Sequence, residues 1–114
     1  MAVYTREYFS GSTDGTPIAI SSTDSAGAQT IHTCSTRKAE IYLFAGNKST
    51  AAVELWIEHG DTVSPIRTLV SAGVGLIPIL PGTPLRNGKV LKGYCSTVST
   101  AAVHVLGWVN ELSS

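Results

Sequence analysis

The chain has 114 residues, of which 43% are hydrophobic and only 14% are charged, and eight basic residues balance eight acidic ones. This length fits one domain with one core. Nucleic-acid binding needs a clustered basic excess to displace phosphate counterions, and the longest basic run here is Arg37-Lys38, so that function is disfavoured. A surface with zero net charge has little protection against self-association, which favours a stable assembly.

The first sixteen residues differ from the rest of the chain. Tyr4, Tyr8 and Phe9 precede residues 10–16, whose Ser, Gly, Thr and Asp content is typical of a linker. Aromatic side chains on such a tether either fold back on the domain or dock on a neighbouring protein. We expect residues 1–16 to be an extended N-terminal arm, mobile in the isolated protein and ordered on a partner, and residues 17–114 to be a single folded domain.

Residues 17–114 show repeated alternation of apolar and polar positions with a period of two, which predicts strands. In the clearest case Val53, Leu55 and Ile57 alternate with polar or aromatic neighbours that include Trp56. The expected strands are 17–22, 29–34, 39–45, 52–58, 65–70, 74–80, 89–98 and 102–112. Strands of this number and spacing indicate an all-β fold, an antiparallel β-sandwich of about eight strands that resembles a jelly roll.

Turn-forming residues predict how these strands connect. Residues 46–49 and the dipeptide Asn87-Gly88 each predict a hairpin between the strands on either side. Pro81-Gly82 is expected to end strand 74–80, since both residues interrupt regular structure. The aliphatic positions of the alternating segments should form the core, and we expect eight of them to be largely buried: Ile41, Leu43, Val53, Leu55, Ile57, Val103, Val105 and Val109.

The residue types that carry chemistry are scattered. His32, His59 and His104 do not share the spacing of a metal site, so we predict no metal, no cofactor and no catalytic residues, and interpret the histidines as polar face residues. The cluster at residues 58–61 contains a histidine and an aspartate but no nucleophile motif, so a strand-ending loop is the better interpretation. Cys34 and Cys95 are interpreted as two buried thiols of a protein made in a reducing cytoplasm.

Neither a secretory signal nor a membrane span is expected. The N-terminus lacks a basic start followed by an apolar stretch, and the longest apolar stretch, residues 74–80, is too short to cross a bilayer. Trp56 and Trp108 are candidates for a sugar-stacking platform, although single tryptophans on sandwich strands more often cover a core edge or an interface.

The order of segments from residue 28 to residue 112 resembles small β-sandwich virion proteins of tailed bacteriophages. The segments that carry the resemblance are 30–33, 39–47, 53–58, 77–82, 85–91 and 105–110, the last reading Val-Leu-Gly-Trp-Val-Asn. The resemblance implies a head decoration (cement) protein, or a small neck or tail component, with no catalytic residues. Residues 1–16 lie outside it.

Two functions therefore compete. The favoured one is a structural protein located on the virion and synthesised in the cytoplasm of the host bacterium. It binds the major capsid protein or other virion proteins as a homo-oligomer such as a trimer, without nucleic acid or membrane. The alternative is a soluble recognition module for a host glycan or peptide. The residues expected to contact a partner are Tyr4, Tyr8, Phe9, Trp56 and Trp108.

Overall fold

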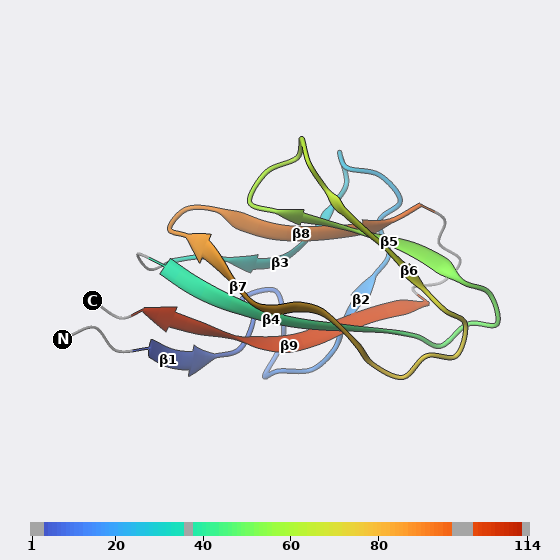
Figure 1. Cartoon of the computed structure of the whole chain (residues 1–114), viewed down its shortest axis with the longest axis horizontal. Coiled ribbons are helices and arrows are strands. Elements are labelled where there is room, and N and C mark those ends of the chain that lie inside the picture. Colours follow the sequence, from blue (N-terminus) through green and yellow to red (C-terminus); the bar gives the residue numbers. More distant parts are fainter. Residues whose placement is uncertain (1–3, 36–37, 97–101, 113–114) are drawn as a thin grey trace.

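In a computed structural model of the chain, which describes residues 4–35, 38–96 and 102–112, antiparallel strands form two sheets packed face to face (Figure 1). The nine strands in these ranges are β1 Tyr4–Glu7, β2 Ile18–Ile20, β3 Gln29–Thr33, β4 Lys38–Asn47, β5 Val53–His59, β6 Ile66–Val70, β7 Ile77–Arg86, β8 Val90–Cys95 and β9 Val103–Leu112. The predicted all-β sandwich is confirmed. Residues 97 and 98, the end of one predicted strand, lie outside the described residues.

Sheet A has the order β1-β9-β4-β7, with β2 also paired to β9, and sheet B has the order β3-β8-β5-β6. From β2 onward every connection crosses between the sheets except the β5–β6 hairpin, which is the connectivity of a jelly roll. β1 and β2 pair with successive parts of one edge of β9, since Tyr4 lies opposite Leu112 and Ile18 opposite Val105. Nine strands therefore occupy eight strand positions.

Both predicted hairpins are wrong. β4 and β5 belong to different sheets, and so do β7 and β8, so residues 46–49 and Asn87-Gly88 carry the chain from one sheet to the other. The local turn at Asn87-Gly88 does form, because Lys89 N donates to Arg86 O at 3.1 Å and Gly88 has a φ of 82°. Turn chemistry predicts where a chain reverses, whereas the sheet that receives the next strand depends on which face must be buried.

The prediction that a strand ends at Pro81-Gly82 is also wrong, because β7 continues through both residues to Arg86. β7 is the outer strand of sheet A, where a missing N–H can point away from the sheet without loss of a ladder bond. Its pairing with β4 shifts register twice, between Ile41 and Tyr42 and between Leu43 and Phe44. These irregularities accommodate the prolines within the strand.

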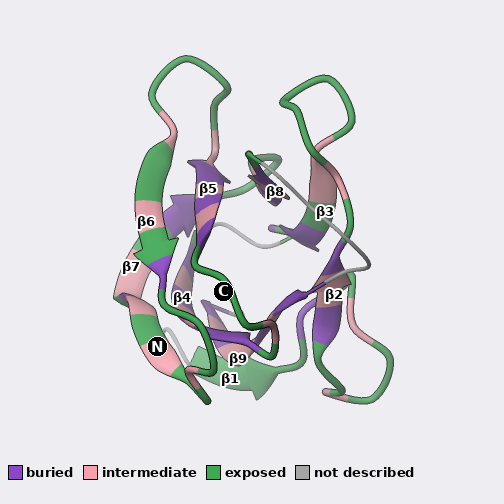
Figure 2. Cartoon of the chain, turned by 90° about the vertical axis from the view of Figure 1, so that its right-hand side faces the viewer, coloured by how far each residue is buried: buried purple, intermediate pink, exposed green. Residues whose placement is uncertain are grey.

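Buried residues occur on strands of both sheets, whereas the loops at the ends of the sandwich are mostly exposed (Figure 2). Burial alternates along β4, β5 and β8, so the core fills the space between the two sheets. All eight predicted core residues are buried, which confirms the strand phase read from the sequence. Burying each such side chain contributes about 1.5–3 kcal/mol relative to leaving it exposed. A helix long and apolar enough to cross a membrane is absent from the ranges described above.

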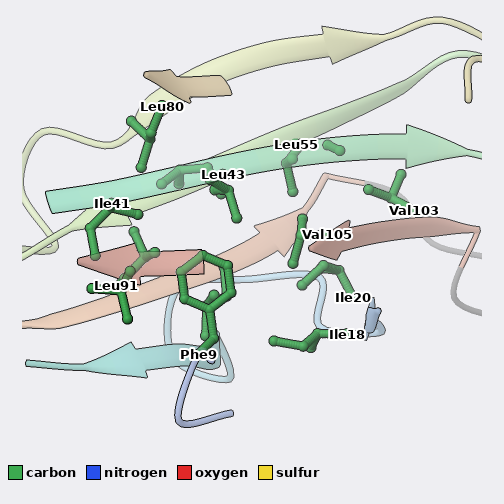
Figure 3. Packing of buried hydrophobic residues seen from close by; sticks show 14 of the residues in the cluster. Phe9, Ile18, Ile20, Ile41, Leu43, Leu55, Leu80, Leu91, Val103 and Val105 are labelled. Carbon is green, nitrogen blue, oxygen red and sulfur yellow. The ribbon is translucent and has the colours of Figure 1, made fainter. Parts of the chain in front are cut away.

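The N-terminal segment does not form the predicted free arm in its described part, residues 4–16. β1 extends sheet A, and Phe9 enters the core, where only 2% of it is exposed (Figure 3). Gly11 N then donates to Ile31 O at 2.9 Å and Ser10 N donates to His32 Nδ1 at 3.0 Å, so the segment also reaches sheet B. Residues 1–3 of the predicted arm lie outside the described residues.

The physical reason for this correction lies in two glycines. A Cβ on Gly107 of β9 would collide with the backbone carbonyl oxygen of Tyr42 and would also stand 3.3 Å from the ring of Phe9, so glycine leaves room for the ring beside β9. A Cβ on Gly11 would collide with the carbonyl oxygens of Thr30 and Ile31, so glycine lets the segment approach β3. The fold-back alternative therefore holds for Phe9. Ser10 and Gly11 bond to residues of β3, whereas the hydroxyls of Ser12 and Thr16 donate to backbone oxygens within residues 10–16.

Candidate functional site

The five residues expected to contact a partner lie in four different places. Phe9 is in the core and is not available to a partner, whereas Tyr4 and Tyr8 are exposed on or next to β1. Trp56 lies on the outer face of sheet B, because its neighbours Leu55 and Ile57 point inward. Trp108 lies on the outer face of sheet A by the same alternation along β9. One ligand cannot stack on both tryptophans, so the platform that would combine them is ruled out.

The outer face of sheet A carries a continuous apolar surface. The ring of Trp108 stacks on Tyr42 with the centroids 5.0 Å apart and the planes at 16°, and Phe44 lies 5.8 Å from Trp108. The strand register adds further apolar residues on the same face, with Leu106 and Pro78 opposite Phe44, and Pro81 opposite Tyr42. We call this surface the aromatic face: Tyr42, Phe44, Pro78, Pro81, Leu106 and Trp108.

The corresponding face of sheet B is mixed in character. Trp56 stacks on Tyr94 at a centroid distance of 6.1 Å with nearly parallel planes. Around this pair stand charged residues: Arg67 lies opposite Trp56 and forms an ion pair with Glu54, and Lys92 lies opposite Glu58. The hydrogen bonds from Arg67 lower the pKa of the Glu54 carboxyl below its ordinary value of 4.5, so this pair is charged at neutral pH and stays charged further into the acid range. The two outer faces therefore differ mainly in charge.

A cleft lies at the edge of the aromatic face. β1 and β2 leave residues 106–108 of β9 without a strand partner on that edge, and a cavity of about 570 Å³ opens there. Its lining includes Tyr8, Trp108, Arg6 and Glu7. The guanidinium of Arg6 lies 5.1 Å from the centre of the Trp108 ring, a cation–π distance. The cleft thus joins two predicted residues with two charged side chains that sequence analysis did not single out.

The histidines occupy separate environments. His32 is buried, which contradicts its interpretation as a face residue, and its Nε2 lies 3.5 Å from Oε1 of Glu111. Since Nδ1 accepts from Ser10 N, the ring proton is on Nε2 and points to Glu111. Burial lowers the pKa of His32, and the Glu111 carboxylate partly offsets that shift. No three His, Cys, Asp or Glu side chains in the described ranges are grouped closely enough to hold a metal ion.

The polar cluster at residues 58–61 separates in the fold. Glu58 is buried and accepts a hydrogen bond from Ser25, while His59 Nε2 lies 2.8 Å from Pro84 O. Asp61 Oδ1 accepts from the N–H groups of Val63 and Ser64, which lowers the pKa of Asp61 and forms the turn between β5 and β6. The loop interpretation is confirmed for Gly60 and Asp61, whereas Glu58 and His59 are the last residues of β5.

Both cysteines are buried, as predicted. Cys34 Sγ lies 3.5 Å from Leu85 O, and burial raises the pKa of the Cys95 thiol to about 11, which keeps it protonated and unreactive at neutral pH.

Two features of the cleft were hidden in the sequence. Arg6 is the one lysine or arginine of residues 1–16, a segment without periodicity, and only its pairing opposite Asn110 brings it beside Trp108. Gly107 interrupts a run of strand-forming residues, and that interruption was the available signal for a close approach of another segment.

No protein-family model, no curated protein and no solved structure matches this chain.

Proposed function

We propose that this chain is a structural protein of a tailed-bacteriophage virion, and specifically a decoration (cement) protein that binds the major capsid protein and stabilises the head lattice. The aromatic face of sheet A carries this proposal. A partly exposed surface with three aromatic side chains, a leucine and two prolines is suited to bury apolar area against another protein. A location in the neck or tail would use the same surface, and the resemblance described above supports either position.

The test is addition of purified protein to undecorated heads, followed by co-sedimentation. Leu106→Glu places a charge in the aromatic face, and Tyr94→Glu places one at a half-buried, outward-facing position of sheet B. We expect Leu106→Glu to abolish binding and Tyr94→Glu to retain it, with melting curves verifying that both variants fold. Equal binding by the two variants would contradict the assignment of the aromatic face, and absence of wild-type binding would contradict the proposed function itself.

The cleft favours a second candidate, a recognition module for a host glycan. An aromatic side chain can stack on the apolar face of a sugar, and neighbouring charged groups such as Arg6 and Glu7 can bond to its hydroxyls. In this case the exposed ring of Tyr8 is the stacking surface, because Trp108 already contacts Tyr42 and Arg6. Retention on a glycan array that is lost in Tyr8→Ala, together with failure to bind heads, would favour this function.

A further inference from the structure

The two sheet edges on one side of the sandwich are protected very differently (Figure 2). β7, the edge of sheet A, contains Pro78, Pro81 and Pro84, whose missing N–H groups hinder pairing with another strand. β6, the edge of sheet B, contains no proline, and the charge of Arg67 is neutralised by Glu54 on β5. Within the described residues β6 pairs with β5 alone.

The direction of the backbone groups on β6 follows from two hydrogen bonds at the ends of β5. Ser96 N donates to Glu54 O, and Gly60 N donates to Val90 O, so even-numbered residues of β5 direct their backbone groups toward β8. The direction of the backbone groups alternates along a strand, so the N–H and C=O of Leu55 point toward β6. The N–H and C=O of its partner Thr68 point back toward β5. The N–H and C=O groups of Arg67 and Leu69 therefore point outward from the sheet.

Apolar side chains are concentrated at the same edge. Of the six large hydrophobic side chains that are exposed in the described ranges, three lie within residues 63–69, namely Val63, Ile66 and Leu69. Leu69 is 56% exposed. Outward backbone donors and acceptors beside exposed aliphatic side chains are the features of an edge that accepts another strand.

We propose that β6 pairs with β6 of a second copy of this chain, antiparallel and about a two-fold axis at Thr68, so that sheet B continues across two molecules. In this register Arg67 lies opposite Leu69 of the second copy, and the outward groups of these residues make four backbone hydrogen bonds across the axis. Ile66 lies opposite Val70 of the second copy on the inner face, which extends the apolar layer.

The charges on the outer face fit a second copy. Glu54 lies opposite Leu69 within one chain, so each Leu69 would stand between its own Glu54 and Arg67 of the other molecule. Glu54 of one molecule and Arg67 of the other then lie in the same row of side chains across the interface, separated by Leu69, and no two like charges lie directly opposite each other. This inference goes beyond the proposed function and does not depend on it, since the pairing concerns the isolated protein.

A cysteine cross-link tests the axis directly. The two Thr68 residues would form a pair without hydrogen bonds, with Cα atoms about 4.5 Å apart, which lies within the range of a disulfide. We expect Thr68→Cys to form a covalent dimer under mild oxidation, whereas the matched control Ser71→Cys, exposed just beyond β6, should not. The buried native thiols Cys34 and Cys95 are present in both variants. Cross-linking of Thr68→Cys no faster than Ser71→Cys would overturn the proposal.

A pair of charge variants at Leu69 provides a second test. Leu69→Lys faces Arg67 of the second copy, and Leu69→Glu faces the same cation with opposite sign. We expect the dimer dissociation constant of Leu69→Lys to exceed that of Leu69→Glu by about tenfold, since two symmetric pairs change together. Sedimentation velocity over a concentration series measures both constants. Within one chain position 69 lies opposite Glu54, so Leu69→Lys should give the monomer a higher melting temperature than Leu69→Glu. This order is opposite to the order expected for dimer affinity, so a change in monomer stability cannot account for the result. A wild-type protein that stays monomeric throughout the series would also overturn the pairing.

Discussion

The two sides of the sandwich end in different ways. On the side of β2 and β3, residues 9–11 run between the sheets, with Phe9 in the core and Gly11 N bonded to Ile31 O on β3. On the side of β6 and β7, each sheet ends in a strand that has one strand partner within the described residues. We call these the closed side and the open side of the sandwich.

This difference separates residues that stabilise the monomer from residues that are available for association. On the closed side the chain satisfies its own backbone groups and buries its own aromatic ring, so substitutions there should lower the free energy of unfolding. On the open side the outward backbone groups of Arg67 and Leu69 on β6 have no strand partner within the described residues, so substitutions there should affect the proposed assembly. The comparison is tested by measuring both quantities for variants on each side.

The largest expected effect on the closed side is that of Phe9→Ala. The ring is buried among core residues and packs against Gly107, so its removal should lower the free energy of unfolding by about 3–5 kcal/mol through lost burial and a cavity. The adjacent Tyr8→Ala is the control, since Tyr8 is 63% exposed, and its effect should stay within about 0.5 kcal/mol. Urea denaturation measures both. Similar values for the two variants would mean that residues 4–16 are indeed a free arm.

A smaller effect is expected for Gly11→Ala. A Cβ at this position would meet the backbone carbonyl oxygens of Thr30 and Ile31, which cannot move aside as a flexible side chain would. The segment must shift outward and weaken its bond to Ile31 O, at an expected cost of about 1–3 kcal/mol. Gly75→Ala is the control, because a Cβ at Gly75 would stand in open space. Gly73 also has open space around it, but its positive φ would strain an alanine. A Gly11→Ala protein as stable as Gly75→Ala would contradict the close approach of the segment to β3.

His32 should make the closed side sensitive to pH. Burial lowers the pKa of His32 in the folded protein below its ordinary value of 6.5, so the unfolded chain takes up a proton more readily. Stability should therefore be fully present above about pH 6.5 and decline as the pH falls through the folded-state pKa. Protonation of Nδ1 would also remove the acceptor for Ser10 N.

Denaturation curves measure this decline when they are recorded from about pH 8 to about pH 5, an interval that spans the ordinary histidine pKa of about 6.5. His32→Asn keeps an acceptor oxygen near the position of Nδ1 but does not titrate, so its stability should depend less on pH. A variant with the full pH dependence of the wild-type protein would assign the effect to another group.

The sequence was sufficient to predict the core and most of the strands, because alternation directly reports which side chains face inward; it missed β1 and the second half of β7. Leu55 and Val105 were assigned to the core from their neighbours alone, and both are fully buried. The hairpin errors arose because a turn such as Asn87-Gly88 carries no information about which sheet receives the following strand. That choice depends on contacts between residues distant in sequence, and a single sequence does not report them.

The candidate site was predicted only in part. Trp108 and Tyr8 do lie together, but Arg6 joins them only through the register of β1 against β9. Phe9 was assigned to a partner surface because residues 10–16 have the composition of a linker. Ser10 and Gly11 instead bond to β3, as when Thr33 N donates to Ser10 Oγ at 2.8 Å, and the hydroxyls of Ser12 and Thr16 donate to backbone oxygens of the same segment. Composition alone does not distinguish a solvated tether from a segment whose polar groups are satisfied by the fold.

The smallest expected effect on the monomer is that of Leu69→Ser on the open side. The Leu69 side chain points outward from β6 and is more than half exposed, so its truncation should change the free energy of unfolding by no more than about 0.5 kcal/mol. Its neighbour Val70 is fully buried and points into the core, so Val70→Ser should be far more destabilising through a cavity and a buried hydroxyl. Denaturation at a protein concentration low enough to keep the chain monomeric isolates these values from association. If Leu69→Ser proves as destabilising as Val70→Ser under those conditions, Leu69 is packed by its own chain, and the open side of the sandwich is closed after all.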